Sequence, residues 1–188
     1  MNSLLTCLAT KSLLFAPPDR PFLLASGATS PYYLDCKGVT LDPKSLRLLA
    51  RVCAERIEQK SWLPMGVGGL TLGADPIAIA LSLEGEKRGH PWLPFIVRKE
   101  TKGRGTHKRV EGNLPVGCDV VVLEDTTTTG GSAMNAVMVL RAEGYQVLGV
   151  LTLVDREEGG KERFDKESVP FEALFTLKEV LARSQELH

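Results

Sequence analysis

The sequence predicts an α/β fold in which helices flank a central, mostly parallel sheet. Two segments, 119–123 and 147–154, are almost entirely apolar, which is typical of strands buried on both faces. Helical segments with polar caps or closing glycines alternate with the strands. Parallel strands require this alternation, because each connection crosses one face of the sheet. The length of 188 residues fits one domain, 1–188.

Two helices and two short strands are expected in the first third of the chain. Leucines at helical spacing predict a helix over 3–14. Short strands are expected over 22–25 and 32–36, on either side of a turn that contains glycine. Asp42 is followed directly by proline, and this pair predicts a capped helix over 43–57.

Strand and helix signals alternate along the rest of the chain. The expected segments are strand 65–69, helix 75–83, strand 94–97, strand 119–123, helix 132–143 and strand 147–154. Asp75 is expected to cap the first of these helices, and Gly144 to close the second.

The composition argues against several classes of protein. The 23 basic residues cancel the 23 acidic ones, so nothing in the balance points to nucleic acid or a membrane surface as a partner. No stretch approaches the ~20 apolar residues that span a bilayer. The four cysteines and three histidines are scattered, without the spacing of a zinc site or a disulfide framework. We therefore expect a cytoplasmic protein without metal ligands of its own.

A basic segment, RKETKGRGTHKRVEG over 98–112, interrupts the alternation. It has no apolar periodicity and contains three glycines. It has six Lys and Arg residues, and Glu100 is the one acidic residue that precedes Glu111. Taken alone, such a run is usually a solvated loop. The motif that follows it in the chain favours a functional role instead.

That motif, VVVLEDTTTTGGS over 120–132, has the pattern of a phosphate site. Glycine-rich backbone at a helix N-terminus presents free N–H groups to an anion, and threonine hydroxyls add donors. Glu124 and Asp125 would repel a phosphate, so sugar hydroxyls or a metal that accompanies the phosphate are their expected partners. The alternative is a plain helix cap at Thr128 or Thr129, but capping does not call for two carboxylates. The motif therefore predicts a site for a phosphorylated ribose.

These residues resemble a known family. VVVLEDTTTTGGS is similar to the phosphoribosyl-pyrophosphate (PRPP) motif of the type I phosphoribosyltransferases. VRKETKGRGT together with VEG resembles the mobile catalytic loop of the orotate phosphoribosyltransferases. FLLASGATSPYYLDCKGVTLDP resembles the N-terminal signature of that family, and LVDREEGG resembles its orotate-contacting segment. The matches run in family order over about 22–160.

The resemblance implies a fold and a reaction. It implies the type I phosphoribosyltransferase fold, with a small N-terminal hood and a mobile catalytic loop. The implied reaction transfers the phosphoribosyl group from PRPP to orotate and yields orotidine 5′-phosphate and pyrophosphate, a step of pyrimidine synthesis. Mg²⁺ is expected to bind mainly through PRPP. The expected assembly is a homodimer whose loop cations reach into the partner's site.

The resemblance also assigns roles to individual residues. Those expected to bind PRPP are Arg98, Lys99, Lys102, Arg104, Glu124, Asp125, Thr126, Thr127, Thr128, Thr129, Gly130, Gly131 and Ser132. Thr128 and Arg156 are expected to contact orotate. A surface ion pair with Glu157 or Glu158 is the alternative for Arg156. The expected catalytic residues are Lys99, Lys102, Arg104 and Asp125.

The chain departs from the family pattern at two places. Many members have Asp-His where this chain has Gly103-Arg104, and often a lysine at the position of Ala25. Arg104 keeps a positive charge but cannot donate a proton near neutral pH. His107 is a possible substitute, although an ordinary loop histidine is the favoured interpretation.

Two other functions remain as alternatives from the sequence. One is a transferase of the same superfamily that uses another base, such as a purine. The other is a PRPP-sensing regulator that binds nucleic acid. Such a regulator should carry a basic face or an added DNA-binding module, which the neutral composition does not favour.

Overall fold

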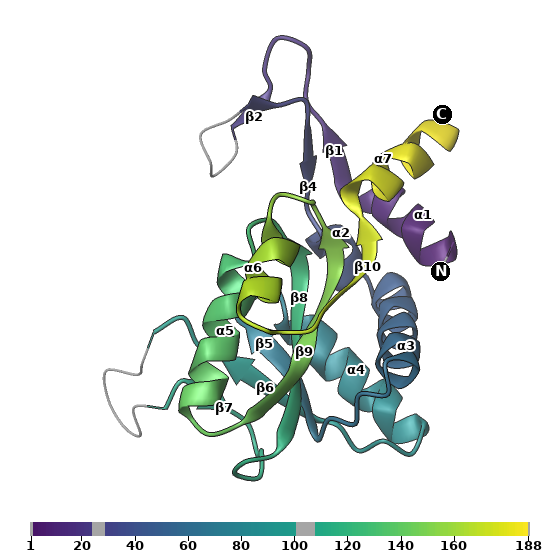
Figure 1. Ribbon diagram of the computed structural model, residues 1–188. Coiled ribbons are helices and arrows are strands. Elements are labelled where there is room, and N and C mark those ends of the chain that lie inside the picture. The colour runs from purple at the N-terminus through teal and green to yellow at the C-terminus, as the bar shows by residue number, and fades with distance from the viewer. Residues whose placement is uncertain (1, 24–28, 101–107, 188) are drawn as a thin grey trace.

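A computed structural model describes residues 2–23, 29–100 and 108–187, and its centre is a six-stranded sheet (Figure 1). The order across the sheet is β10 (Phe171–Thr176), β9 (Gln146–Asp155), β8 (Asp119–Thr127), β5 (Gly66–Leu70), β6 (Leu93–Val97) and β7 (Val110–Glu111). All neighbouring pairs are parallel except β6 and β7, which are antiparallel at the edge. The predicted α/β class with a mostly parallel sheet is confirmed.

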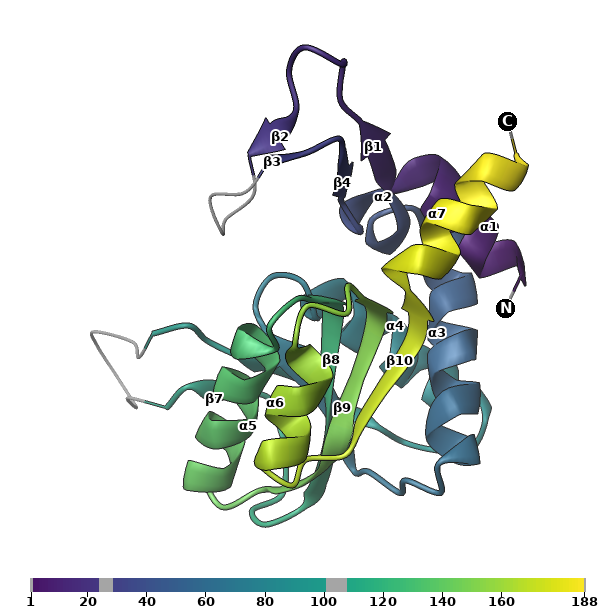
Figure 2. The ribbon, with the colours of Figure 1, turned by 45° about the horizontal axis from the view of Figure 1, so that its top comes forward.

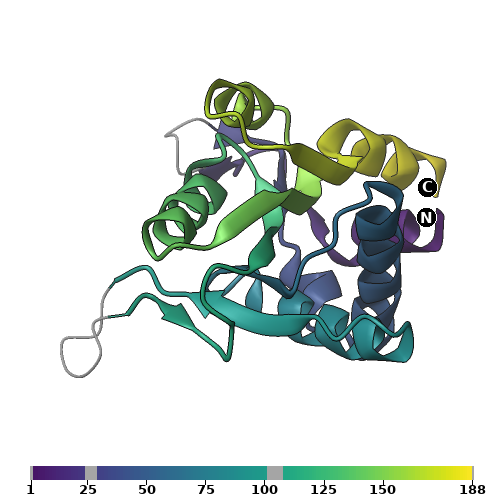
Figure 3. The same ribbon diagram turned by 60° about the horizontal axis from the view of Figure 1, so that its bottom comes forward.

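Helices pack on both faces of this sheet (Figure 3). α3 (Pro43–Gln59) and α4 (Asp75–Lys87) cover one face, and α5 (Gly131–Ala142) and α6 (Gly160–Lys166) cover the other. Successive side chains of a strand point to opposite faces. Accordingly, Val121 and Leu123 of β8 join the core beneath α3 and α4, whereas Val120 and Val122 join the core beneath α5. This arrangement explains why residues 120–123 of β8 are apolar on both faces.

The N-terminal residues form a hood at one end of the sheet (Figure 2). Its elements are α1 (Asn2–Lys11), β1 (Leu13–Phe15), β2 (Phe22–Leu23), β3 (Thr29–Ser30), β4 (Tyr32–Leu34) and α2 (Lys37–Thr40). α7 (Leu177–Glu186) packs against α1 on the outer side. Thus a helix from the far end of the chain completes the hood.

Pairing in the hood differs from the sequence-based expectation. β2 covers the first two residues of the strand expected over 22–25, and β4 lies within the strand expected over 32–36. They do not pair with each other: β2 pairs with β3 and β4 pairs with β1. The helix expected over 3–14 ends at Lys11, because Leu13 to Phe15 form a ladder with β4. The Leu13 side chain is buried as a strand residue, so its place in the leucine pattern was misleading.

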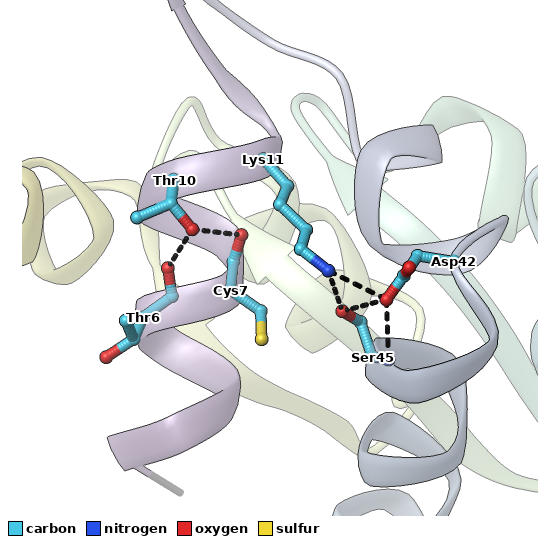
Figure 4. A network of polar contacts seen from close by, with 6 residues as sticks. All are labelled: Thr6, Cys7, Thr10, Lys11, Asp42 and Ser45. Carbon is cyan, nitrogen blue, oxygen red and sulfur yellow. Dashed lines mark hydrogen bonds and ion pairs between the residues drawn. The ribbon is translucent and has the colours of Figure 1, made fainter.

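The helix starts show which caps were predicted correctly. Asp42 caps α3 by accepting a hydrogen bond from the Ser45 N–H at 2.9 Å, as expected. Lys11 of α1 donates to the same Asp42 carboxylate at 2.8 Å and to Ser45 Oγ at 3.1 Å (Figure 4). These contacts hold the pKa of Asp42 well below its usual range, Lys11 contributing most. For α4 the expected cap was wrong: Ala74 is the cap and Asp75 is the first helical residue.

Within residues 2–23, 29–100 and 108–187, no helix has the length and apolar character that crossing a membrane requires.

Candidate active site

The carboxyl ends of β5, β8 and β9 lie at the edge of the sheet that faces the hood (Figure 2). Open parallel sheets bind their ligands outside this edge. Three loops meet there: 71–74 after β5, 128–130 after β8 and 156–159 after β9. The predicted phosphate motif forms the middle loop.

The turn from β8 into α5 forms an anion cradle. α5 begins at Gly131 rather than at Ser132, and its cap is Gly130, whose φ of 72° lies in the left-handed region. The alternative cap at Thr128 or Thr129 is therefore wrong, and these hydroxyls are not used to cap the helix. A small pocket at this turn is lined by Glu124, Thr126, Thr127, Thr128, Gly130, Gly131, Ser132 and Ala133. Backbone N–H groups at such a helix start favour an anionic group.

Glu124 is a buried acid at the end of the cradle. Its residue is only 7% exposed, and its Oε2 atom has no hydrogen-bond partner among the described residues. Burial, together with the neighbouring Asp125, raises the pKa of Glu124 to about 8, and the Lys99 ammonium acts in the opposite direction. A buried oxygen without a partner can accept a hydrogen bond from a bound hydroxyl.

Asp125 lies between the cradle and the loop after β5. Its Oδ1 accepts a hydrogen bond from the Thr126 N–H at 2.8 Å. A Cβ added to Gly73 would lie 2.7 Å from the same oxygen, so a larger residue there would push the Asp125 carboxylate aside. The loop after β5 and Asp125 border a cavity of about 400 Å³, which is lined by Lys37, Thr40, Leu41, Leu72, Gly73, Asp75, Pro76 and Asp125.

Sequence reasoning missed the loop over 71–74 and the hood residues at this cavity. Thr71 Oγ1 donates to Asp75 Oδ2 at 2.7 Å, which ties the loop to the start of α4. Cys36 Sγ lies 3.2 Å from Thr126 Oγ1 and 3.7 Å from the Asp125 carbonyl oxygen. Burial raises the pKa of the Cys36 thiol to about 12, so the sulfur is held as a neutral packing and hydrogen-bonding group. No local sequence signal marks these long-range contacts.

Arg156 directly follows β9 and lies beside the cradle. Its backbone N–H donates to the Thr127 carbonyl oxygen at 2.9 Å. The side chain is 13% exposed, and Nη2 lies 2.8 Å from Glu158 Oε1. Its buried Nε has no partner in the described part of the chain. The ion pair considered from the sequence therefore exists, with Glu158, while Glu157 pairs with Lys178.

The basic loop is described only at its two ends. Arg98 Nη1 lies 3.5 Å from Glu111 Oε1 of β7. The charge of Lys99 lowers the pKa of Glu124 in its own chain, against the larger effects of burial and Asp125. Lys102, Arg104 and His107 lie outside the described residues.

Comparison with solved structures defines the class of protein. The chain superposes on Aeropyrum pernix orotate phosphoribosyltransferase with a TM-score of 0.80 and 33% identity, covering 93% of each chain. Mycobacterium tuberculosis orotate phosphoribosyltransferase in complex with PRPP gives a TM-score of 0.78 and 32% identity, covering 95% of this chain and 96% of that one. With the anion cradle at the carboxyl edge, this fold defines a type I phosphoribosyltransferase.

Sequence comparison narrows the class to one family. No family model matches the sequence. The Aquifex aeolicus orotate phosphoribosyltransferase is 47% identical over 164 residues, which is 87% of this chain and 88% of that protein. This chain belongs to the orotate phosphoribosyltransferase family.

Proposed function

We propose that this chain transfers the phosphoribosyl group of PRPP to orotate at the carboxyl edge of its sheet. The observation that carries the proposal is the union of two features at that edge. An acidic pair, buried Glu124 and half-buried Asp125, precedes a helix N-terminus that can hold an anion. The backbone N–H of Arg156 donates to the carbonyl oxygen of Thr127, the last residue of β8 before the cradle. A phosphorylated sugar and a planar anion would thus lie side by side.

PRPP is assigned to the cradle over 124–132. The N–H groups at the start of α5 and the threonine hydroxyls would hold the 5′-phosphate, and the helix dipole favours its charge. Glu124 and Asp125 would accept hydrogen bonds from the ribose hydroxyls. The M. tuberculosis relative was solved with PRPP, which supports PRPP as the ligand of this family.

The reaction requires positioning and charge stabilisation. The bond from the anomeric carbon to pyrophosphate breaks and a bond to a base nitrogen forms, through a state in which the sugar carries positive charge. Negative charge grows on the leaving pyrophosphate, where Lys99, Lys102 and Arg104 would stabilise it. Arg156 would bind the orotate carboxylate through its planar guanidinium, with Thr128 as a second contact.

Mg²⁺ is assigned to PRPP rather than to a protein metal site. Among the described residues, no group of three or more His, Cys, Asp or Glu side chains could hold a metal ion. The carboxylate of Asp125 beside the cavity fits a metal held mainly by phosphate oxygens. Bound in this way, Mg²⁺ would neutralise charge on the pyrophosphate.

A homodimer is proposed on the basis of exposed apolar side chains at the cavity and on α4. Leu41 and Leu72, which line the cavity, are 67% and 81% exposed, and Ile79 and Leu83 on α4 are more than half exposed. Burying such a surface against a second copy would bring the two active sites near the interface. All four thiols are free, which fits a reducing compartment such as the cytoplasm.

The proposal is tested by an assay with orotate, PRPP and MgCl₂, following the absorbance change as orotate becomes its nucleotide. Asp125→Asn should raise KM for PRPP far more than KM for orotate. Asp119→Asn is the matched control, because Asp119 begins the same strand at the opposite edge of the sheet. Turnover of adenine or hypoxanthine without turnover of orotate would show that the enzyme uses a purine base as its acceptor. Full activity in excess chelator would exclude the metal role.

A further inference from the structure

We propose that Arg109 is a positioning residue for the transfer reaction, because its guanidinium fixes the backbone of Arg98 and Lys99 to α5. The inference rests on the proposed function through the role of Lys99. The residues concerned form the base of the basic loop, on either side of 101–107. Taken alone, the sequence of this segment is typical of a solvated loop, but several hydrogen bonds hold its base in the structure.

The guanidinium of Arg109 reaches two successive carbonyl groups. Nε and Nη2 donate to the Arg98 carbonyl oxygen at 3.0 and 2.9 Å, and Nη2 also donates to the Lys99 carbonyl oxygen at 2.9 Å. In return, the Arg98 N–H donates to the Arg109 carbonyl oxygen at 2.8 Å. Backbone and side-chain hydrogen bonds together therefore hold the two ends of the basic loop against each other.

The same residue connects the loop base to α5. Nη2 lies 3.3 Å from Asn135 Oδ1, and the Arg109 N–H donates to Glu143 Oε1 at 3.0 Å. α5 is the helix whose N-terminus forms the phosphate cradle. Arg109 thus places the backbone of Lys99 in a fixed relation to the element that holds PRPP.

This relation matters because Lys99 acts on the acid in the cradle. Its ammonium lowers the pKa of Glu124, against the larger effects of burial and Asp125. A lysine ammonium lies at the end of a long side chain with many rotamers, so its position is defined only if the backbone of the residue is fixed. Misplacing a reacting or stabilising group by about 1 Å can cost a factor of ~10² in rate.

Lysine cannot replace the guanidinium in this role. The bonds use a planar fork whose donors reach acceptors on three residues, Arg98, Lys99 and Asn135. A lysine ammonium is a compact point charge on a flexible stem, so it keeps the charge but loses the fixed geometry. Geometry rather than charge is therefore the property that Arg109 contributes.

The test compares Arg109→Gln, Arg109→Lys and the parent, with Arg56→Gln as the matched control. Arg56 is also a part-buried arginine that bonds a carboxylate and a carbonyl, at Glu172 and Ala173, but it joins α3 to β10. Both Arg109 variants should lower kcat about ten- to a hundredfold, with KM for orotate changed less than about twofold. Arg56→Gln should lower the melting temperature and leave kcat near the parental value.

Amide hydrogen exchange at residues 98–100 gives a readout independent of turnover. Exchange there should be faster in both Arg109 variants and unchanged in Arg56→Gln. A folded Arg109→Gln protein with parental exchange, or an Arg109→Lys protein with parental kcat, would overturn the inference. If exchange is faster in the Arg109 variants but Lys99→Ala keeps full activity, the proposed role of Lys99 is contradicted. The role of Arg109 in holding the backbone of residues 98–100 would still stand.

Discussion

Arg156 and Glu158 form an ion pair at the end of β9, with Nη2 and Oε1 2.8 Å apart. The arginine is mostly buried, whereas the glutamate side chain is 42% exposed and can leave without disturbing the core. If orotate presents its carboxylate to the same guanidinium, Glu158 is its competitor for Nη2. Half-exposed ion pairs are worth little, so the competition should be weak and measurable.

Glu158→Gln should therefore lower KM for orotate, by up to about fivefold, because the competing charge is removed. Glu157→Gln is the control: it makes the same change one residue earlier, where the partner is Lys178. Steady-state kinetics with each substrate varied would measure the effect, and KM for PRPP should not change. A rise in KM for orotate would mean that Glu158 holds Arg156 in its binding position.

Glu124 should give PRPP use a distinctive pH dependence. Since its pKa is raised to about 8, the side chain is largely protonated at neutral pH and becomes an acceptor-only carboxylate as the pH rises. We expect kcat/KM for PRPP to increase between about pH 7 and 9, and Glu124→Gln to abolish this limb. A parental profile in Glu124→Gln would assign the limb to another group.

The same pKa shift predicts the sign of a stability effect. The folded protein keeps the Glu124 proton up to about pH 8, whereas the unfolded chain loses it near 4.5. The contribution of this side chain to stability is therefore present at low pH and is lost as the pH rises from about 4.5 to about 8. Urea unfolding should show Glu124→Gln gaining stability relative to the parent as the pH is raised from 5 to 9.

Gly130→Ala should damage both stability and the cradle. A Cβ at this position would lie 3.0 Å from Phe164 Cζ and would be placed on a backbone with φ of 72°. Left-handed backbone alone costs an ordinary residue about 1–2 kcal/mol. Gly144→Ala is the control, because its φ is 90° and no described atom lies within 4 Å of the added Cβ. The cradle variant should lose more stability than the control and should also raise KM for PRPP.

Shared active sites can be tested by mixing subunits. For this test Lys102→Ala is preferable to Lys99→Ala, because the charge of Lys99 acts on Glu124 of its own chain. Mixed with Asp125→Asn and allowed to exchange, it should form hybrid dimers in which one site has both groups intact. Random pairing then gives about a quarter of parental activity. Hybrids confirmed by mass measurement but without activity would place the loop in the site of its own subunit.

Arg104 is expected to act as an electrostatic clamp and not as an acid. Arg104→Ala should slow turnover by about 10²–10³ at every pH, since loss of a charged contact to the transition state has this size. The pH–rate profile should keep its shape. A fully active Arg104→Ala enzyme beside an inactive His107→Ala enzyme would transfer the role to His107.

The central strands of the sheet could be predicted from the sequence because their signals are local. The segment 119–123 is apolar on both faces and lies within β8, and 147–154 lies within β9. The prediction failed in the hood, where Leu13 has a helical spacing but pairs as a strand. β10 and α7 were missed, although the capping box from Thr176 to Glu179 is visible in the sequence.

The site divides in the same way. Glu124 through Ser132 are contiguous, so one motif identified the cradle. Contacts with residues distant in the sequence place three further residues at the site: Cys36, Gly73 and Arg109. Cysteine, glycine and arginine also occur at many positions without a functional role, so their presence in the sequence does not mark a site. Only the folded chain brings them to the site.

The packing of α1 against α7 also sets an order of events during synthesis (Figures 1 and 2). Leu4 and Leu8 are fully buried in a core that includes Leu177 and Val180, and Arg183 Nε donates to Thr6 Oγ1 at 3.1 Å. Domains generally begin to fold from the N-terminus as the ribosome releases them. Here α1 cannot complete its packing until α7 has emerged. A nascent chain therefore carries exposed leucines on α1 until the residues of α7 have been translated, and chaperones that bind apolar segments would find them there.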